Sequence, residues 1–183
     1  HPDKVCDQIS DAILDAYLLQ DPTSRVAVEV VGGHGRVFIT GEITSKAKVE
    51  LSPIIKRLAG DVDASIHIAK QSPEISIGVD SGGAGDQGIM VGYAVNETQE
   101  LLPLEAILAR SLNQFIFNIW PYDGKTQITL KNNKITAVVA SFQHAPTAEL
   151  KTLVETWLDN QPKAGKIKLH ANPSGDWSQG GFD

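Results

Sequence analysis

The sequence contains a single cysteine, Cys6, among its 183 residues. One cysteine excludes an internal disulfide, and it also excludes a zinc site built from several cysteines. Cys6 lies on the apolar side of the first predicted helix. This cysteine usage is typical of proteins of a reducing compartment, and we therefore expect a cytoplasmic location.

Long hydrophobic runs and an excess of basic residues are also missing. No apolar stretch approaches the length that crosses a membrane, and no signal-peptide pattern precedes the first helix. The 16 Lys and Arg are outnumbered by 22 Asp and Glu, which gives a net charge of −6. Because nucleic acids and anionic membranes attract proteins with a sustained basic field, we expect neither as a partner.

The common phosphate-binding motifs are absent as well. The chain has no GxxxxGK[ST] sequence, and it has no GxGxxG sequence after a predicted strand. Its composition, 42% hydrophobic and 21% charged, is that of an ordinary globular protein with one large or two small domains. A nucleotide would therefore need a different and local kind of site.

Residues 1–70 predict a helix, a hairpin, a second helix and a third strand. Val5, Ile9 and Ile13 recur at helical spacing in a stretch that ends before Pro22. The segments RVAVEVV and RVFITGEIT flank the loop GGHG and are rich in β-branched residues, so they predict a hairpin. A helix that starts at Ser52 and the strand DASIHIAK complete this unit.

The second half repeats this order. After a strand GIMVGYAV, we expect a helix PLEAILARSLNQFIF, a hairpin around Asn132 and Asn133, a helix TAELKTLVETWLD and a strand KIKLHA. The predicted fold class is therefore α+β, with repeated units of antiparallel or mixed sheet that helices cover on one face. We divide the chain into a first unit (1–70), a linker or flexible gating loop (71–85) and a second unit (86–183).

Several short stretches hold residues suited to ligands, and each has an ordinary alternative. His1, Asp3 and Lys4 lie at the mouth of a helix, where free N–H groups favour anions, but Asp3 also suits a simple N-cap. Glu29 and Glu42 lie in apolar strands, where each carboxylate either meets a cation or faces water. GAGDQG, DGK and NPSGDW lack regular periodicity and are, taken alone, ordinary turns.

Taken together and in order, these stretches resemble the S-adenosylmethionine synthetase (methionine adenosyltransferase) family. The match rests on HPDK before VCDQISDAILDA, then GEIT, KQSP, GAGDQG with GYA and NET, DGK with TQIT, and NPSG with GG. It covers nearly the whole chain. In that family similar α+β units form a pseudo-threefold fold, so the resemblance implies a third unit that this sequence does not contain.

The resemblance implies that methionine sulfur attacks C5′ of ATP, and that the released triphosphate is hydrolysed to pyrophosphate and phosphate. It also implies Mg²⁺ and K⁺ as cofactors. By position, the implied roles are these: catalytic His1, Lys4 and Lys125; ATP-binding His1, Asp123, Lys125, Asp176 and Trp177; methionine-binding Glu42, Gln71 and Asp86; a Mg²⁺ ligand at Asp3; and a K⁺ ligand at Glu29.

The sequence also departs from the family pattern. Asp176 stands where the family usually has an arginine after NPTG, which reverses the charge beside the nucleotide. Glu74 replaces the usual Asp, and the loop over residues 73–83 is shorter than usual. The chain begins at HPDK and stops at GGFD, so we expect a fragment that lacks further phosphate-binding residues.

The resemblance further implies a homodimer or a higher oligomer, with active sites between the subunits. Our first hypothesis is an enzyme of one-carbon metabolism, or the larger part of one, that makes S-adenosylmethionine from ATP and L-methionine. The alternative is a non-catalytic nucleotide-binding or regulatory subunit that keeps the scaffold. A plain protein-interaction domain ranks last, because it leaves the coordinated polar residues unexplained.

Overall fold

The computed structural model describes residues 1–80, 82–84 and 87–182. The chain forms two compact units. The first unit contains Pro2–Met90 together with the C-terminal residues from Gly181 onward, and the second unit contains Val91–Gly180 together with His1. Each unit has its own sheet and its own hydrophobic core.

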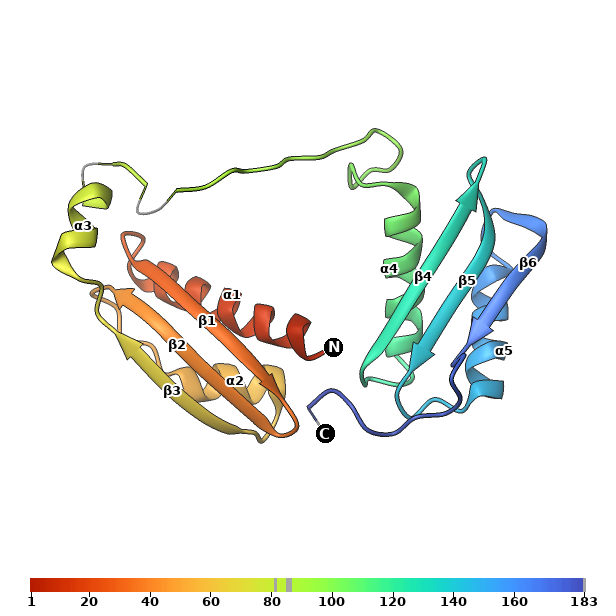
Figure 1. The fold of residues 1–183 in the computed structure, drawn as a ribbon, viewed down its shortest axis with the longest axis horizontal. Coiled ribbons are helices and arrows are strands. Elements are labelled where there is room, and N and C mark those ends of the chain that lie inside the picture. The colour runs from red at the N-terminus through yellow and green to blue at the C-terminus, as the bar shows by residue number, and fades with distance from the viewer. Residues whose placement is uncertain (81, 85–86, 183) are drawn as a thin grey trace. The chain divides into compact units, whose positions relative to one another are not determined.

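The first unit packs helices against one face of a three-stranded sheet (Figure 1). Its strands lie in the order β1-β2-β3, with β1 antiparallel and β3 parallel to β2. The core between α1, α2 and the sheet contains Ile9, Ile13, Val28, Ile39 and Ile55. The elements are α1 (Pro2–Gln20), β1 (Arg25–Gly33), β2 (Arg36–Thr44), α2 (Leu51–Ala59), β3 (Asp63–Ala69) and α3 (Pro73–Asp80).

The second unit has the same topology. Its strands lie in the order β4-β5-β6, and again the hairpin is antiparallel while the last strand is parallel to the middle one. Asn132 and Asn133 take φ angles of 51° and 57°, as a type I′ hairpin turn requires. The elements are α4 (Leu104–Phe117), β4 (Gly124–Lys131), β5 (Lys134–Phe142), α5 (Thr147–Leu158) and β6 (Lys163–Ala171).

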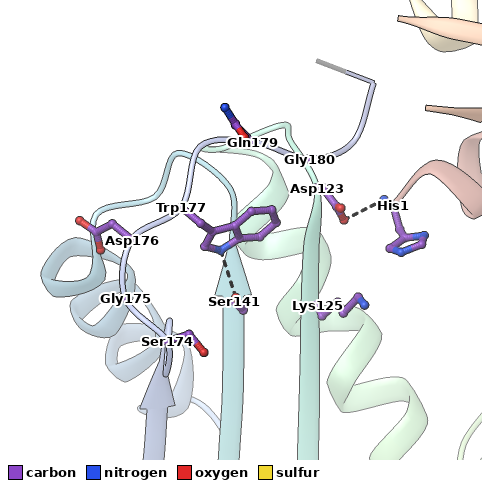
Figure 2. A pocket seen from close by; sticks show the side chains of 10 residues that line it. All are labelled: His1, Asp123, Lys125, Ser141, Ser174, Gly175, Asp176, Trp177, Gln179 and Gly180. Atoms are coloured by element: carbon purple, nitrogen blue, oxygen red, sulfur yellow. Dashed lines mark hydrogen bonds and ion pairs between the residues drawn. The ribbon is translucent and has the colours of Figure 1, made fainter. Parts of the chain in front are cut away.

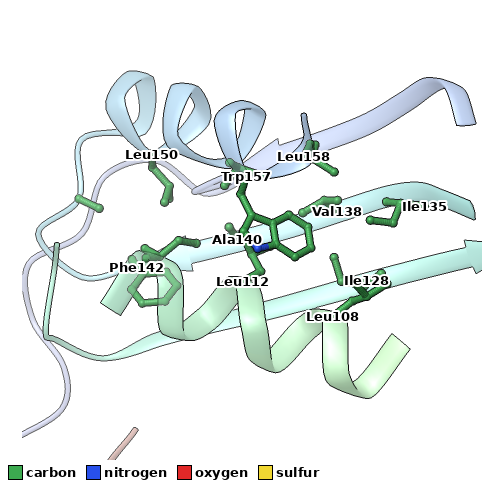
Figure 3. Close-up of a cluster of buried hydrophobic side chains, with 13 residues drawn as sticks. Leu108, Leu112, Ile128, Ile135, Val138, Ala140, Phe142, Leu150, Trp157 and Leu158 are labelled. Atoms are coloured by element: carbon green, nitrogen blue, oxygen red, sulfur yellow. The ribbon is translucent and has the colours of Figure 1, made fainter. Parts of the chain in front are cut away.

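The second core lies between the sheet and the helices α4 and α5 (Figure 3). Leu112 comes from α4, Phe142 from β5 and Leu150 from α5, and all three are fully buried. From Val138 to Phe142, every second side chain of β5 enters this core. The predicted α+β class with helix-covered sheets is confirmed, and each sheet is mixed.

Three details of the sequence interpretation differ from the structure. Residues 88–95 form no strand, although GIMVGYAV predicted one. Ile89, Met90 and Val91 are about nine-tenths exposed, and none of the described strands pairs with this segment, so these apolar residues are not buried here. Helix α3 forms inside the segment that showed little periodicity, and β6 begins at Lys163 rather than Lys166.

Helix α1 buries Cys6, Ile9 and Ile13 along one stripe, as its spacing predicted. The cysteine is 5% exposed, and burial raises the pKa of its thiol. In the described part of the chain, no helix has both the length and the apolar character needed to span a membrane.

The connection that follows α1 is fixed by the carboxylate of Asp21. This carboxylate accepts hydrogen bonds from the backbone N–H of Thr23 at 3.0 Å and of Lys46 at 2.8 Å. It also accepts from the hydroxyls of Thr23 and Ser45. These bonds, led by the one from Lys46, hold the pKa of Asp21 well below its ordinary value of 3.8.

We expect Asp21 to contribute an acid-sensitive part of the stability of the chain. Because the folded state favours the charged carboxylate, this contribution is present above about pH 4 and is lost as the pH falls below the unfolded-state value. The free energy of unfolding is measured by urea denaturation at pH 5 and at pH 3. Between these two pH values it should fall less in Asp21→Asn than in the wild-type protein. The exposed α1 variant Asp11→Asn is the control, and equal losses in Asp21→Asn and wild type would contradict this role.

Candidate functional site

A pocket of about 410 Å³ lies at one end of the sheet of the second unit (Figure 2). Its volume is in the range of small-molecule sites. The topology explains why its walls meet there. The start of β4 lies beside the end of β5, because they are antiparallel, and the end of β6 lies beside the end of β5, because they are parallel. The lining residues are His1, Asp123, Lys125, Ser141, Ser174, Gly175, Asp176, Trp177, Gln179 and Gly180.

Trp177 forms the aromatic wall of this pocket. Its indole Nε1–H donates to the hydroxyl of Ser141 at 3.1 Å, and its carbonyl accepts from the N–H of His144 at 2.9 Å. The backbone folds closely over the ring, since a side chain at Gly180 would lie 2.8 Å from the indole Cζ3 atom. The indole is therefore held in place and presents an apolar surface to a ligand.

Asp123 and Lys125 supply opposite charges to the same pocket. The side chain of Asp123 is 11% exposed, and its Oδ1 atom forms an ion pair with the α-amino nitrogen of His1 at 3.3 Å. A nearly buried carboxylate is costly unless a cation or a hydrogen-bond donor offsets its lost hydration. Lys125 is exposed on β4, directly opposite Ser141 in the strand register.

The backbone behind the pocket depends on two buried polar side chains that the sequence interpretation did not single out. Asn172 is 3% exposed; it accepts from the N–H of Phe142 at 3.0 Å and donates to the carbonyl of Ala145 at 2.8 Å. Gln143 is 1% exposed, and its amide donates to the carbonyl of Ser178 at 3.0 Å. Asn172 belongs to the NPSG turn, so a turn-forming Asn was the available signal, whereas nothing around Gln143 indicates its role.

The carboxylate of Asp176 bonds to the start of α5, whereas the sequence interpretation placed its charge beside a nucleotide. Its carboxylate accepts from the backbone N–H of Thr147 at 2.9 Å and from the hydroxyl of Thr147, at the start of α5. These bonds lower the pKa of Asp176. The residue lines the pocket, but its charge is directed to a helix N-terminus.

The remaining candidates belong to the first unit. Asp3 and Lys4 are exposed in the first turn of α1. Glu29 is exposed on the edge strand β1, and Glu42 is half-buried on β2. Because Glu29 pairs with Thr40 in the register, Glu29 and Glu42 are diagonal neighbours on the sheet face that the helices leave uncovered. Glu29 is exposed in the single chain, and its two readings, a cation ligand and a water-facing residue, both stay predictions.

Gln71 lies two residues after Ala69, the β3 residue that pairs with Glu42. Its Oε1 atom is buried and accepts no hydrogen bond from the described residues, and the same holds for the hydroxyl of Thr44, two residues after Glu42. Two unsatisfied acceptors close to Glu42 in the register indicate a place for a donor from a ligand. Asp86, the third candidate of this group, lies outside the described residues.

The described residues contain no group of three or more His, Cys, Asp or Glu side chains that could hold a metal ion. A site made only of protein ligands is therefore not found in this part of the chain. Mg²⁺ usually keeps several waters and takes phosphate oxygens alongside one or two carboxylates. The single carboxylate of Asp3 fits such a site, and the carboxylate of Glu29 offers oxygen to K⁺.

Two family models match the chain, one after the other. Residues 1–79 match the model described as "S-adenosylmethionine synthetase, N-terminal domain". Residues 81–177 match the model described as "S-adenosylmethionine synthetase, central domain". The two matches cover both α+β units described above.

Curated relatives agree with these matches. The chain is 37% identical to "S-adenosylmethionine synthase 1" of Frankia casuarinae, over 99% of this chain and 59% of the relative. It is 38% identical to "S-adenosylmethionine synthase" of Sorangium cellulosum, over 99% of this chain and 53% of the relative. It is also 43% identical to the protein of that name from Prochlorococcus marinus (strain AS9601), over 80% of this chain and 45% of the relative.

Nearly all of this chain matches the first two of these relatives, but the chain spans little more than half of their length. The alignment with the Frankia protein extends over 237 residues, although this chain has 183. The relative therefore carries residues within the matched region that this chain does not have.

Proposed function

We propose, from the premise that this chain belongs to the S-adenosylmethionine synthetase family, that it acts as a methionine adenosyltransferase, an enzyme that makes S-adenosylmethionine. Its substrates are ATP and L-methionine. The sulfur of methionine forms a bond to C5′ of the ribose, and the bond from C5′ to the triphosphate oxygen breaks. The triphosphate leaves with the bonding electron pair and is then hydrolysed to pyrophosphate and phosphate.

The observation that carries this proposal is the shared pocket of Asp123, Lys125 and Trp177. In the proposal, Trp177 packs against the adenine ring, the carboxylate of Asp123 accepts a hydrogen bond from the nucleoside, and Lys125 balances phosphate charge. An aromatic wall, an acceptor and a cation together match the three chemical parts of ATP. Asp176 is kept in the ATP-binding set as a residue that lines this pocket.

The methionine side of the reaction requires negative charge and acceptors. We assign Glu42 to the ammonium group of methionine, and Gln71, with its unsatisfied Oε1, to a second donor on the same substrate. Asp86 is assigned to the forming sulfonium. Anionic groups near a sulfur that becomes positively charged stabilise the transition state more than the ground state.

The phosphate side requires positive charge. His1 is assigned to the leaving oxygen, Lys4 adds a second cation, Asp3 holds Mg²⁺ and Glu29 holds K⁺. When bound, Mg²⁺ would neutralise charge on the polyphosphate. The residues of this chain orient the triphosphate, and the segment 71–85, which includes α3, is proposed as the gate that excludes water.

The proposal includes an assembly and a location. We assign the chain to a homodimer, or to a higher oligomer built from dimers, with active sites between the subunits, and we place it in the cytoplasm. The competing proposal is a nucleotide-binding or regulatory subunit without turnover. Asp176, which stands where the family usually has an arginine, keeps this alternative in the test.

Product formation tests the proposed function. Purified protein is incubated with ATP, L-methionine, Mg²⁺ and K⁺, and S-adenosylmethionine is measured by mass spectrometry. Product above a heat-treated control supports the transferase. ATP binding without product supports the regulatory subunit, and the absence of both ATP binding and product contradicts both proposals.

Lys125→Met is expected to weaken ATP binding by roughly 10- to 100-fold, because one charge-assisted contact to phosphate is lost. Isothermal titration calorimetry measures this change whether or not the chain turns over. Lys134→Met is the matched control, since Lys134 is exposed at the turn end of the same hairpin. Equal affinities of the two variants for ATP would remove Lys125 from the site.

A further inference from the structure

We propose that Asp176 is a positioning residue that clamps the NPSGDW turn onto the start of α5 and so fixes the indole of Trp177 in the pocket. The part of this inference that concerns ATP rests on the proposed function. The clamp itself consists of contacts within the second unit, so it can be tested without ATP.

Helix α5 begins in an unusual way. The first N–H groups of a helix need acceptors from outside the helix, and a Ser, Thr, Asn or Asp at the N-cap usually provides one. Here the N-cap is Pro146, which makes no side-chain capping bond. Asp176, 29 positions further along the chain, provides the acceptor for the N–H and the hydroxyl of Thr147.

The turn before Asp176 is tight. Asn172 and Gly175 have φ angles of 39° and 94°, and the N–H of Gly175 donates to the carbonyl of Asn172 at 2.7 Å. This tight turn sets the direction of the chain directly before Asp176. A residue in the left-handed region tolerates little rotation without losing such a bond.

Asp176 and Trp177 are both attached to the corner between β5 and α5. The side chain of Asp176 bonds to Thr147, and the carbonyl of Trp177 accepts from the N–H of His144. These two attachments fix the backbone on both sides of the Trp177 nitrogen. Because this backbone is fixed, little conformational entropy is lost when the indole bonds to Ser141. An indole that is already ordered lowers the entropic cost of binding a ligand.

The clamp explains why an acidic residue is compatible with a pocket for an anionic ligand. The carboxylate is engaged with the positive end of a helix, where negative charge is stabilising. Its essential property in this role is an acceptor oxygen rather than a charge. Asparagine has the same acceptor and is an equally good cap, so Asp176→Asn and Asp176→Ala separate the clamp from an electrostatic role.

The experiment compares these two variants by NMR and by ATP titration of the full chain. The indole N–H resonance of Trp177, assigned by its loss in Trp177→Phe, is expected to shift or broaden in Asp176→Ala and to stay near its original position in Asp176→Asn. ATP affinity is expected to fall about tenfold in Asp176→Ala and to fall clearly less in Asp176→Asn. Lys151→Ala, on the exposed side of α5, is the control and should change neither.

Two results would overturn the inference. An unchanged Trp177 resonance in Asp176→Ala would show that the indole does not depend on the clamp. A loss in Asp176→Asn as large as in Asp176→Ala would assign the role to the charge. Should Asp176→Ala fail to fold, Thr147→Val removes only the hydroxyl bond and gives the same readout in graded form. Should the protein bind no ATP, the proposed function fails while the resonance still decides the clamp.

Discussion

Gly41→Ala is expected to lower the free energy of unfolding by roughly 2–6 kcal/mol, because it combines backbone strain with a collision in a paired strand. Gly41 lies in β2 opposite Val28 and has a φ of 143°, which favours glycine. A Cβ atom there would collide with the carbonyl oxygen of Ala27 and lie 2.9 Å from Cα of Val28. Both neighbours are backbone, so neither can rotate away. Urea denaturation followed by circular dichroism measures the loss.

Gly35→Ala is the matched control for Gly41→Ala. Gly35 has a φ of 71°, but no atom lies within 4 Å of the place that a Cβ atom would take, so only the conformational cost of about 1 kcal/mol remains. A loss in Gly41→Ala no larger than in Gly35→Ala would show that the strand relaxes around the new methyl group. Because Gly41 directly precedes Glu42, relaxation would also displace a proposed methionine-binding residue.

Asn172→Ala is expected to cost a similar amount, roughly 2–6 kcal/mol, through a different mechanism. Removing the carboxamide leaves the N–H of Phe142 and the carbonyl of Ala145 buried without partners, at about 1–3 kcal/mol for each group. Both groups belong to the corner that supports the pocket. The denaturation midpoint of the second unit should therefore fall, and ATP binding should weaken with it.

Asn133→Ala separates this loss from the cost of the backbone conformation. Asn133 also has a positive φ, 57°, but its side chain is exposed at the hairpin turn. We expect a loss of about 1 kcal/mol, since alanine is only moderately strained in this conformation. If Asn172→Ala costs no more than Asn133→Ala, then water or a shifted backbone satisfies the two buried groups.

Much of the fold follows from local patterns in the sequence. The helical spacing in α1 and α5 and the β-branched residues in β1 and β2 identified these elements within a few residues. The pair Asn132 and Asn133 indicated the second hairpin, because both residues accept the left-handed conformation that a two-residue turn needs. The repeated order of elements then predicted two similar units, and both have the same strand pairing.

The segments that the sequence interpretation misjudged depend on contacts that a local pattern does not contain. GIMVGYAV has the apolar composition of a strand, but a strand also needs a hydrogen-bonded neighbour, which the described residues do not provide. Helix α3 has only eight residues and includes Gly78, so its periodicity was too short to recognise.

The residues of the candidate site also fall into those that the sequence identified and those that it did not. The pocket residues Asp123, Lys125 and Trp177 came from the family resemblance, and the strand topology brings them together. The supporting residues Asn172 and Gln143 were missed, because a buried amide between two loops has no sequence pattern. The capping of α5 by Asp176 was also missed, since the two residues are 29 positions apart.

The return of the chain to the first unit has a consequence for how the molecule is put together. The backbone of Gly181 and Phe182 accepts hydrogen bonds from His34 and Gly35, and the ring of Phe182 packs on the first core. Residues 91–180 therefore form a domain that is inserted into the first unit. The entropic cost of closing such an insertion grows only with the logarithm of its length. The inserted domain could therefore change in length at small entropic cost, provided that the chain still returns to the place where Phe182 packs on the first core.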